Sequence, residues 1–137
     1  MSSSSERSGT VAPAFGAAHL HAELEELGYA VTMVEAAQQS FVVITAYVVP
    51  AGQFADRVID LGLPAPPDFP NTVGAAIHVR ATPQLHARGH VKDVRNVIDS
   101  PLGPEWCYWS HRIPWAGERA GAAARLLAHV ASIFERA

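Results

Sequence analysis

Four short strand-like segments follow one another in the first two thirds of the chain, and they constrain the fold more than any other feature. Apolar and polar residues alternate along the first, third and fourth, and the second is dense in Val, Ile, Phe and Tyr, as β-strands are. Short connections between successive strands predict an antiparallel meander. The predicted strands cover residues 29–35, 41–49, 57–63 and 73–80.

Two segments with helical periodicity flank these strands. Leu20, Leu24 and Leu27 recur at helical spacing, and Gly28 is a natural stop, which predicts a short amphipathic helix over residues 17–27. A stronger apolar stripe predicts a second helix over residues 118–136. Together these elements predict an α+β fold with an N-terminal helix, a four-stranded antiparallel meander, an irregular active-site loop and a C-terminal helix.

The segment between the fourth strand and the last helix is expected to be irregular. Residues 82–115 contain six Pro or Gly breakers, and a long irregular segment in a compact domain is usually functional. Residues 1–13 are Ser-rich without periodicity, so we expect a disordered tail. Residues 14–137 then form one domain, as the chain length of 137 residues suggests.

Composition excludes several classes of protein. A hydrophobic content of 49% provides for a packed core, and no apolar run is long enough to cross a bilayer. The start of the chain lacks the apolar segment of a signal peptide, and a single cysteine forms no internal disulfide, so we expect a cytoplasmic location. A net charge of −3 without a basic stripe predicts no dedicated nucleic-acid binding and no membrane binding.

The only cysteine, Cys107, lies among aromatic residues and four positions before His111. A lone thiol near an imidazole suits nucleophilic chemistry, since His can act as a general base near neutral pH. In an irregular segment, four residues allow the chain to fold back toward the thiol. The alternative is a small apolar side chain packed by Trp106 and Trp109, because free Cys is often buried.

The chain resembles the ubiquitin-conjugating-enzyme (UBC) superfamily in the order of these elements and in four local features. Pro66-Pro67-Asp68-Phe69-Pro70 is similar to the Pro-x-x-Tyr-Pro crossing after the third strand, and Thr82-Pro83-Gln84-Leu85 to a degraded His-Pro-Asn motif after the fourth. Cys107 precedes Trp115 by eight residues, and Trp115-Ala116-Gly117 leads into a helix as the Trp-Ser-Pro of that superfamily does. The region from Gly103 to Trp115 resembles the bacterial branch, encoded beside ubiquitin-like modifiers, activating enzymes and JAB-type peptidases in anti-phage islands.

This resemblance implies a bacterial ubiquitin-like-protein conjugating enzyme. An activating enzyme would pass a modifier to Cys107 as a thioester, and an amine of a protein substrate would then attack it. The resemblance assigns His111 to proton transfer and Gln84 to support of the oxyanion. Partners would be the modifier, the activating enzyme and the substrate, with no cofactor or metal on this chain.

Departures from the superfamily pattern leave alternatives open. Gln84 stands where Asn is expected, about twenty residues before Cys107, and Asn96 and Asp99 compete for its role. A catalytically inactive UBC-like scaffold that binds a modifier or its activating enzyme is one alternative. A hydrolase that uses Cys107 and His111, oriented by Asp99, is another.

His78, His86 and His90 are weaker candidates for functional residues. His86 and His90 are four residues apart, but Gly89 between them and the basic neighbours argue against zinc. His78 is expected to face solvent or a covering loop.

Overall fold

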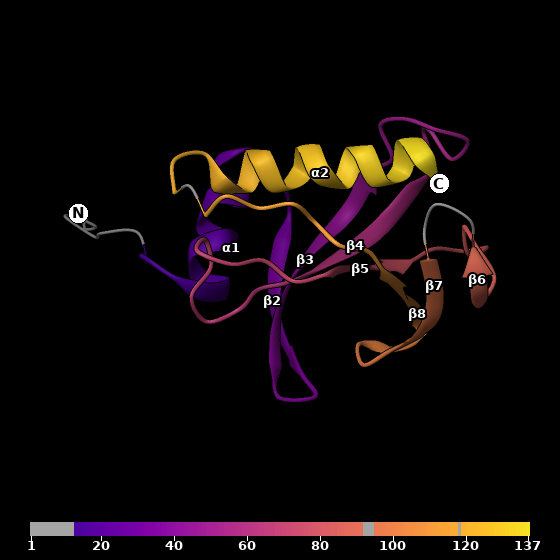
Figure 1. Ribbon diagram of the computed structural model, residues 1–137, viewed down its shortest axis with the longest axis horizontal. Coiled ribbons are helices and arrows are strands. Elements are labelled where there is room, and N and C mark those ends of the chain that lie inside the picture. The colour runs from indigo at the N-terminus through magenta and orange to yellow at the C-terminus, as the bar shows by residue number, and fades with distance from the viewer. Residues whose placement is uncertain (1–12, 92–94, 118) are drawn as a thin grey trace.

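The computed structural model describes residues 13–91, 95–117 and 119–137, which form an α+β fold with one sheet and two helices in those ranges (Figure 1). The predicted tail lies outside the described residues, apart from its last residue. The sheet order is β2-β3-β4-β5-β8-β7-β6, and every pairing is antiparallel. The elements are α1 (Gly16–Glu26), β2 (Val31–Ala36), β3 (Gln39–Val48), β4 (Val58–Pro64), β5 (Ala76–Arg80), β6 (Gly89–Val91), β7 (Arg95–Ser100), β8 (Gly103–Ser110) and α2 (Ala122–Arg136).

The predicted meander corresponds to strands β2 to β5, which pair in sequence order. Alternation puts one set of side chains on the face that the helices cover. Ile44 of β3 lies opposite Leu61 of β4, and Leu61 opposite Val79 of β5. All three side chains are fully buried. The alternating pattern therefore set both the strands and the face that forms the core.

The prediction of an irregular segment over residues 82–115 is wrong for residues 89–91, 95–100 and 103–110, which are strands. Three more strands, β6, β7 and β8, extend the sheet beyond β5, and β8 is inserted between β5 and β7. Pro101 and Gly103 lie at the tight connection between β7 and β8, where such residues are favoured. The run from Trp106 to Trp109 is rich in aromatics, which suit a pleated strand.

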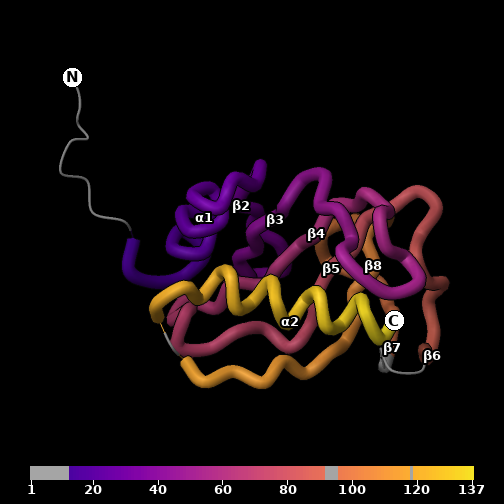
Figure 2. Tube along the Cα trace, turned by 90° about the horizontal axis from the view of Figure 1, so that it is seen from above, coloured from indigo at the N-terminus to yellow at the C-terminus, as the bar shows by residue number. Residues whose placement is uncertain are grey.

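Both helices cover the same face of the sheet, and α2 lies across it (Figure 1). The chain between β8 and α2 runs back alongside α2, as Figures 1 and 2 both show. The apolar stripe of α2 faces the sheet and is buried at Ala122, Ala123, Leu126, Val130, Ile133 and Phe134. Hydrophobic burial of this stripe holds the helix in place.

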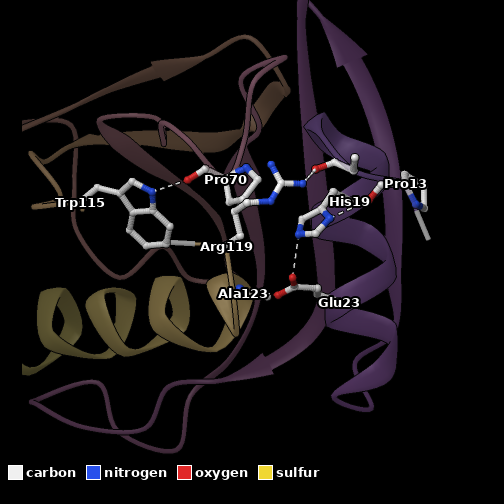
Figure 3. Close-up of polar contacts among 8 residues, drawn as sticks. Pro13, His19, Glu23, Pro70, Trp115, Arg119 and Ala123 are labelled. Atoms are coloured by element: carbon white, nitrogen blue, oxygen red, sulfur yellow. Dashed lines mark hydrogen bonds and ion pairs between the residues drawn. The ribbon is translucent and has the colours of Figure 1, made fainter. Parts of the chain in front are cut away.

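Polar contacts between distant segments join the start of α2 to α1 and to the proline-rich crossing (Figure 3). Glu23 of α1 accepts a hydrogen bond from the backbone N–H of Ala123 at 2.8 Å. The indole Nε1 of Trp115 donates to the carbonyl of Pro70 at 2.7 Å, and its ring stacks near Phe69. Two of the local features that carry the UBC resemblance, the crossing and the Trp, are therefore in direct contact.

The opposite face of the sheet has a small core of its own, and His78 lies in it. His78 is only 2% exposed, so the expectation that it faces solvent is wrong. Its ring contacts Phe41 and Tyr108 edge-on, and its Nδ1 is 2.7 Å from the hydroxyl of Ser100. Leu102, in the β7–β8 turn, packs over Gly62 beside it.

Candidate functional site

Cys107 lies in the middle of β8, on the core face of the sheet. Its cross-strand neighbours are Val79 of β5 and Asp99 of β7. The side chain is 0% exposed and belongs to the main hydrophobic core. Because β8 has a strand on each edge, the backbone on both sides of Cys107 is committed to the sheet. The structure therefore places this thiol in the core and not in a loop.

Burial also makes the thiol a poorer nucleophile. Loss of solvation raises the pKa of Cys107, because the thiolate is charged and the thiol is not. The Arg88 guanidinium nearby lowers this pKa and the Asp99 carboxylate raises it, but burial is the largest cause. The fraction of reactive thiolate at neutral pH is thus smaller than for a free cysteine.

The segment between β5 and β6 crosses the sheet beside Cys107 and is tied down at several points. Arg88 donates to the carboxylate of Asp99 at 2.5 Å and, through Nη2, to the carbonyl of Trp106 at 3.3 Å. His86 packs against the ring of Trp109 at 5.2 Å between centroids. Leu85, the residue before His86, is buried in the core. Access to Cys107 from this side would require the segment to lift off the sheet.

Gln84, the predicted oxyanion donor, belongs to this crossing segment. Its Nε2 donates to the carbonyl of Glu105 at 2.5 Å, two residues before Cys107 along β8. The side chain therefore reaches the strand that carries the thiol, and one of its amide hydrogens is already used there. It acts in this structure as a tether between the segment and β8.

His111 is the first residue after β8, and only Ser110 separates it from Trp109. Its backbone N–H donates to the carbonyl of Ala75, which continues the β5–β8 pairing by one bond. Four residues of extended chain span about 13 Å, so the imidazole is far outside hydrogen-bond reach of the Cys107 thiol. The expectation that the chain folds back toward the thiol fails because the segment is a strand.

The two competing candidates for oxyanion support are placed differently. Asp99 is the cross-strand neighbour of Cys107, but its carboxylate is paired with Arg88. Asn96 pairs with His90 in the β6–β7 hairpin and is exposed. Neither is a hydrogen-bond donor placed beside the thiol, and among the described residues no contact joins Cys107, His111 and Asp99 in the order of a hydrolase triad.

Sequence reasoning missed the surroundings of His111, where several basic side chains gather. The Nε2 of His111 lies 3.2 Å from Nη2 of Arg136 on α2, with the guanidinium as the donor. Arg112, His129 and Ser132 line the same small pocket. The helical spacing of residues 125, 129, 132 and 136 was a signal in the sequence, but only the fold shows that His111 and Arg112 face that stripe.

Two further findings concern metal binding and membrane spanning. Within 13–91, 95–117 and 119–137, no group of three His, Cys, Asp or Glu side chains is arranged to hold a metal ion. No described helix is long and apolar enough to span a bilayer.

The contact between the proline-rich crossing and Trp115 joins two of the features that carry the UBC resemblance. The family described as Prokaryotic E2 family E matches residues 19–136, so the chain belongs to this family. This membership suggests a role in ubiquitin-like conjugation, with protein partners such as modifiers or activating enzymes. Searches of the curated proteins and of the solved structures give no match.

Proposed function

We propose that this chain is a non-catalytic E2-like component of a bacterial ubiquitin-like conjugation pathway. It binds the modifier or its activating enzyme, and Cys107 carries no thioester. The observation that supports this proposal best is the complete burial of Cys107 in a strand paired on both edges. As the resemblance to the bacterial branch implies, this pathway would be an anti-phage conjugation system.

Thioester chemistry makes demands that this geometry does not meet. The thiolate must reach an activated carboxyl group, and the thioester must then be open to an amine. Here the thiol is buried, its pKa is raised, and the histidine assigned to proton transfer is about 13 Å away along the strand. Freeing the thiol would break the hydrogen bonds of Arg88 and Gln84, each worth up to about 1 kcal/mol at such exposed positions.

A second candidate is the conjugating enzyme itself, with Cys107 as the acceptor. Two observations favour it: the family match, and the position of Arg88, whose positive charge lowers the thiol pKa. In this mechanism the thiolate attacks the modifier's C-terminal carboxyl, activated on the activating enzyme, and displaces that enzyme's leaving group to form the thioester. An amine then attacks the thioester and releases the thiol. Residues 82–88, between β5 and β6, would have to move away from β8 before the first step. His111 and Gln84 would act only after that rearrangement.

A reconstitution separates the two candidates. The protein is mixed with the activating enzyme and mature modifier encoded beside it and Mg-ATP, and products are run on reducing and non-reducing gels. Binding to each partner is measured in parallel by calorimetry. We expect binding without a reducible adduct, and equal binding by Cys107→Ala. An adduct that disappears with reductant and with Cys107→Ala would establish the second candidate, and absence of binding to either partner would refute the first.

A further inference from the structure

A groove runs along α2, between that helix and the chain that follows β8. Its narrow end is a pocket of about 90 Å³ whose lining includes His111, Arg112, His129, Ser132 and Arg136. One water molecule takes about 30 Å³ of liquid volume, so this pocket has room for a group the size of a carboxylate. The groove widens past Pro114 and Trp115, where the neighbouring hollow measures about 320 Å³.

The charge of the groove is opposite to that of the whole chain. The net charge is −3, yet the three adjoining hollows are lined by Arg112, Arg125 and Arg136 and by no described Asp or Glu. The nearest described acidic residues are Glu135, beside Arg136 on α2, and Asp68, which is hydrogen-bonded to Thr72, and neither lines the hollows. A groove walled by one sign of charge favours a ligand of the other sign.

The basic side chains are held in an arrangement suited to oxygen ligands. Arg136 donates to Nε2 of His111 at 3.2 Å, which orients its guanidinium across the pocket and leaves its other N–H groups for further acceptors. The hydroxyl of Ser132 and the imidazole of His129 add hydrogen-bonding groups to the same wall. Guanidinium and hydroxyl groups together recognise carboxylates well.

The wide part of the groove adds an apolar platform. The half-buried ring of Trp115 forms its floor, and it is fixed by the hydrogen bond to Pro70. Arg125 lies 6.0 Å from the ring centroid, and the ring of His129 lies 6.1 Å from it. A ligand there would meet an aromatic surface beside a cation, which suits a chain that alternates apolar and acidic side chains.

We propose that this groove binds an extended acidic peptide segment, with a carboxylate in the Arg112–Arg136 pocket and the neighbouring side chain over Trp115. A peptide fits better than a nucleic acid, because a chain of net negative charge repels a long polyanion while a short groove of cations holds one or two carboxylates. The inference is independent of the function of Cys107, which lies on another part of the fold.

The test uses a fluorescein-labelled peptide in which Glu alternates with Leu, and a partner peptide with Gln in place of Glu. Binding is followed by fluorescence anisotropy at low and moderate salt. We expect the Glu peptide to bind and the Gln peptide to bind at least about tenfold more weakly, since a lost charge-assisted contact costs about 1.4 kcal/mol or more. Binding of the Glu peptide should weaken as salt increases.

Matched variants locate the binding. Arg112→Gln with Arg136→Gln should weaken the Glu peptide at least about tenfold. Arg57→Gln with Arg80→Gln removes the same charge outside the groove and should leave affinity within about twofold. Each double variant is checked for folding by circular dichroism. Arg112→Lys with Arg136→Lys should bind the Glu peptide with an affinity between those of the two Gln double variants.

Three outcomes overturn the proposal. One is equal binding of the Glu and Gln peptides, and another is equal loss in the two double variants. The third is tighter binding of a labelled DNA oligonucleotide than of the Glu peptide, with the same dependence on Arg112 and Arg136. That result would assign the groove to phosphate and not to carboxylate.

Discussion

Glu23 of α1 supplies the N-terminal cap of α2 from one hundred residues away in sequence. Its carboxylate accepts from the backbone N–H of Ala123 at 2.8 Å, while Gly121 at the N-cap position has no side chain to do so. The first N–H groups of a helix need such partners, and a negative charge there also complements the helix dipole. This contact fixes α1 to the start of α2.

Removal of this cap is expected to destabilise the whole domain. Glu23→Ala should lower the free energy of unfolding by about 1 kcal/mol, within the range found for N-cap substitutions. Urea denaturation followed by circular dichroism measures this loss. The control is Glu26→Ala, an exposed position at the end of α1, which should change stability by less than about 0.5 kcal/mol. Equal effects of the two substitutions would contradict the capping role.

Two glycines with positive φ separate steric from conformational effects. Gly52 and Gly28 have φ of +86° and +97°, so alanine is strained at both. A Cβ at Gly52 would also collide with the carbonyl oxygen of Phe134, whereas a Cβ at Gly28 would meet nothing within 4 Å. Gly52→Ala should therefore cost at least about 2 kcal/mol more than Gly28→Ala. Thermal unfolding compares them, and similar losses would show that Gly52 does not contact the end of α2.

His78 is expected to make stability depend on pH. Burial lowers its pKa from 6.5 to about 4, so the unfolded chain binds a proton more readily than the folded one. Its contribution is complete above about pH 6.5 and is lost as pH falls toward 4, with a total of about 3 kcal/mol. Ser100 accepts from the N–H of Leu102 and can donate its own hydrogen to the neutral imidazole, which fits this direction.

The measurement is urea denaturation of the wild type and of His78→Gln at about pH 7.5 and about pH 4.5. The wild type should lose more stability than the variant between these values, by roughly 2 kcal/mol. His90→Gln, at an exposed position of β6, should keep the wild-type dependence. The same pH dependence in all three proteins would mean that His78 is not titrating from a buried state.

Substitution of Cys107 should affect stability as it does for a core residue. Cys107→Ala should cost about 1 kcal/mol through the lost sulfur contacts, and Cys107→Ser should cost more, because it buries a hydroxyl in an apolar site. An exposed acceptor thiol would tolerate both with little loss. Guanidinium denaturation of the three proteins distinguishes the two situations, and serine equal to wild type would argue for an exposed thiol.

The sequence was most informative where one signal determined the structure. Alternation identified β2, β4 and β5, the density of β-branched and aromatic residues identified β3, and the apolar stripe identified α2. The same method failed over residues 82–115, because Pro and Gly there mark turns between strands and edges of the sheet and not an irregular loop. Local sequence could not show that β8 pairs with β5, since this pairing joins residues about thirty positions apart.

The site predictions failed or succeeded for the same reason. A four-residue separation allowed Cys107 and His111 to meet only if the chain was irregular, and a strand separates them instead. Gln84 does reach β8, but as a tether to Glu105. His78 is buried against Tyr108 and Ser100, which belong to strands that the sequence analysis did not predict. The basic groove likewise needs the fold to bring Arg112 against α2.

The most direct test of the account is the reactivity of Cys107, because it is the only cysteine in the chain. The native protein is treated with N-ethylmaleimide at neutral pH, and the labelled fraction is followed by intact-mass spectrometry, with the protein in guanidinium as the reference. We expect the native thiol to react at least about a hundredfold more slowly than the unfolded one, since labelling must await opening of the structure. A native thiol that reacts as fast as the unfolded one would contradict the core position of Cys107 and restore it as the acceptor of a modifier.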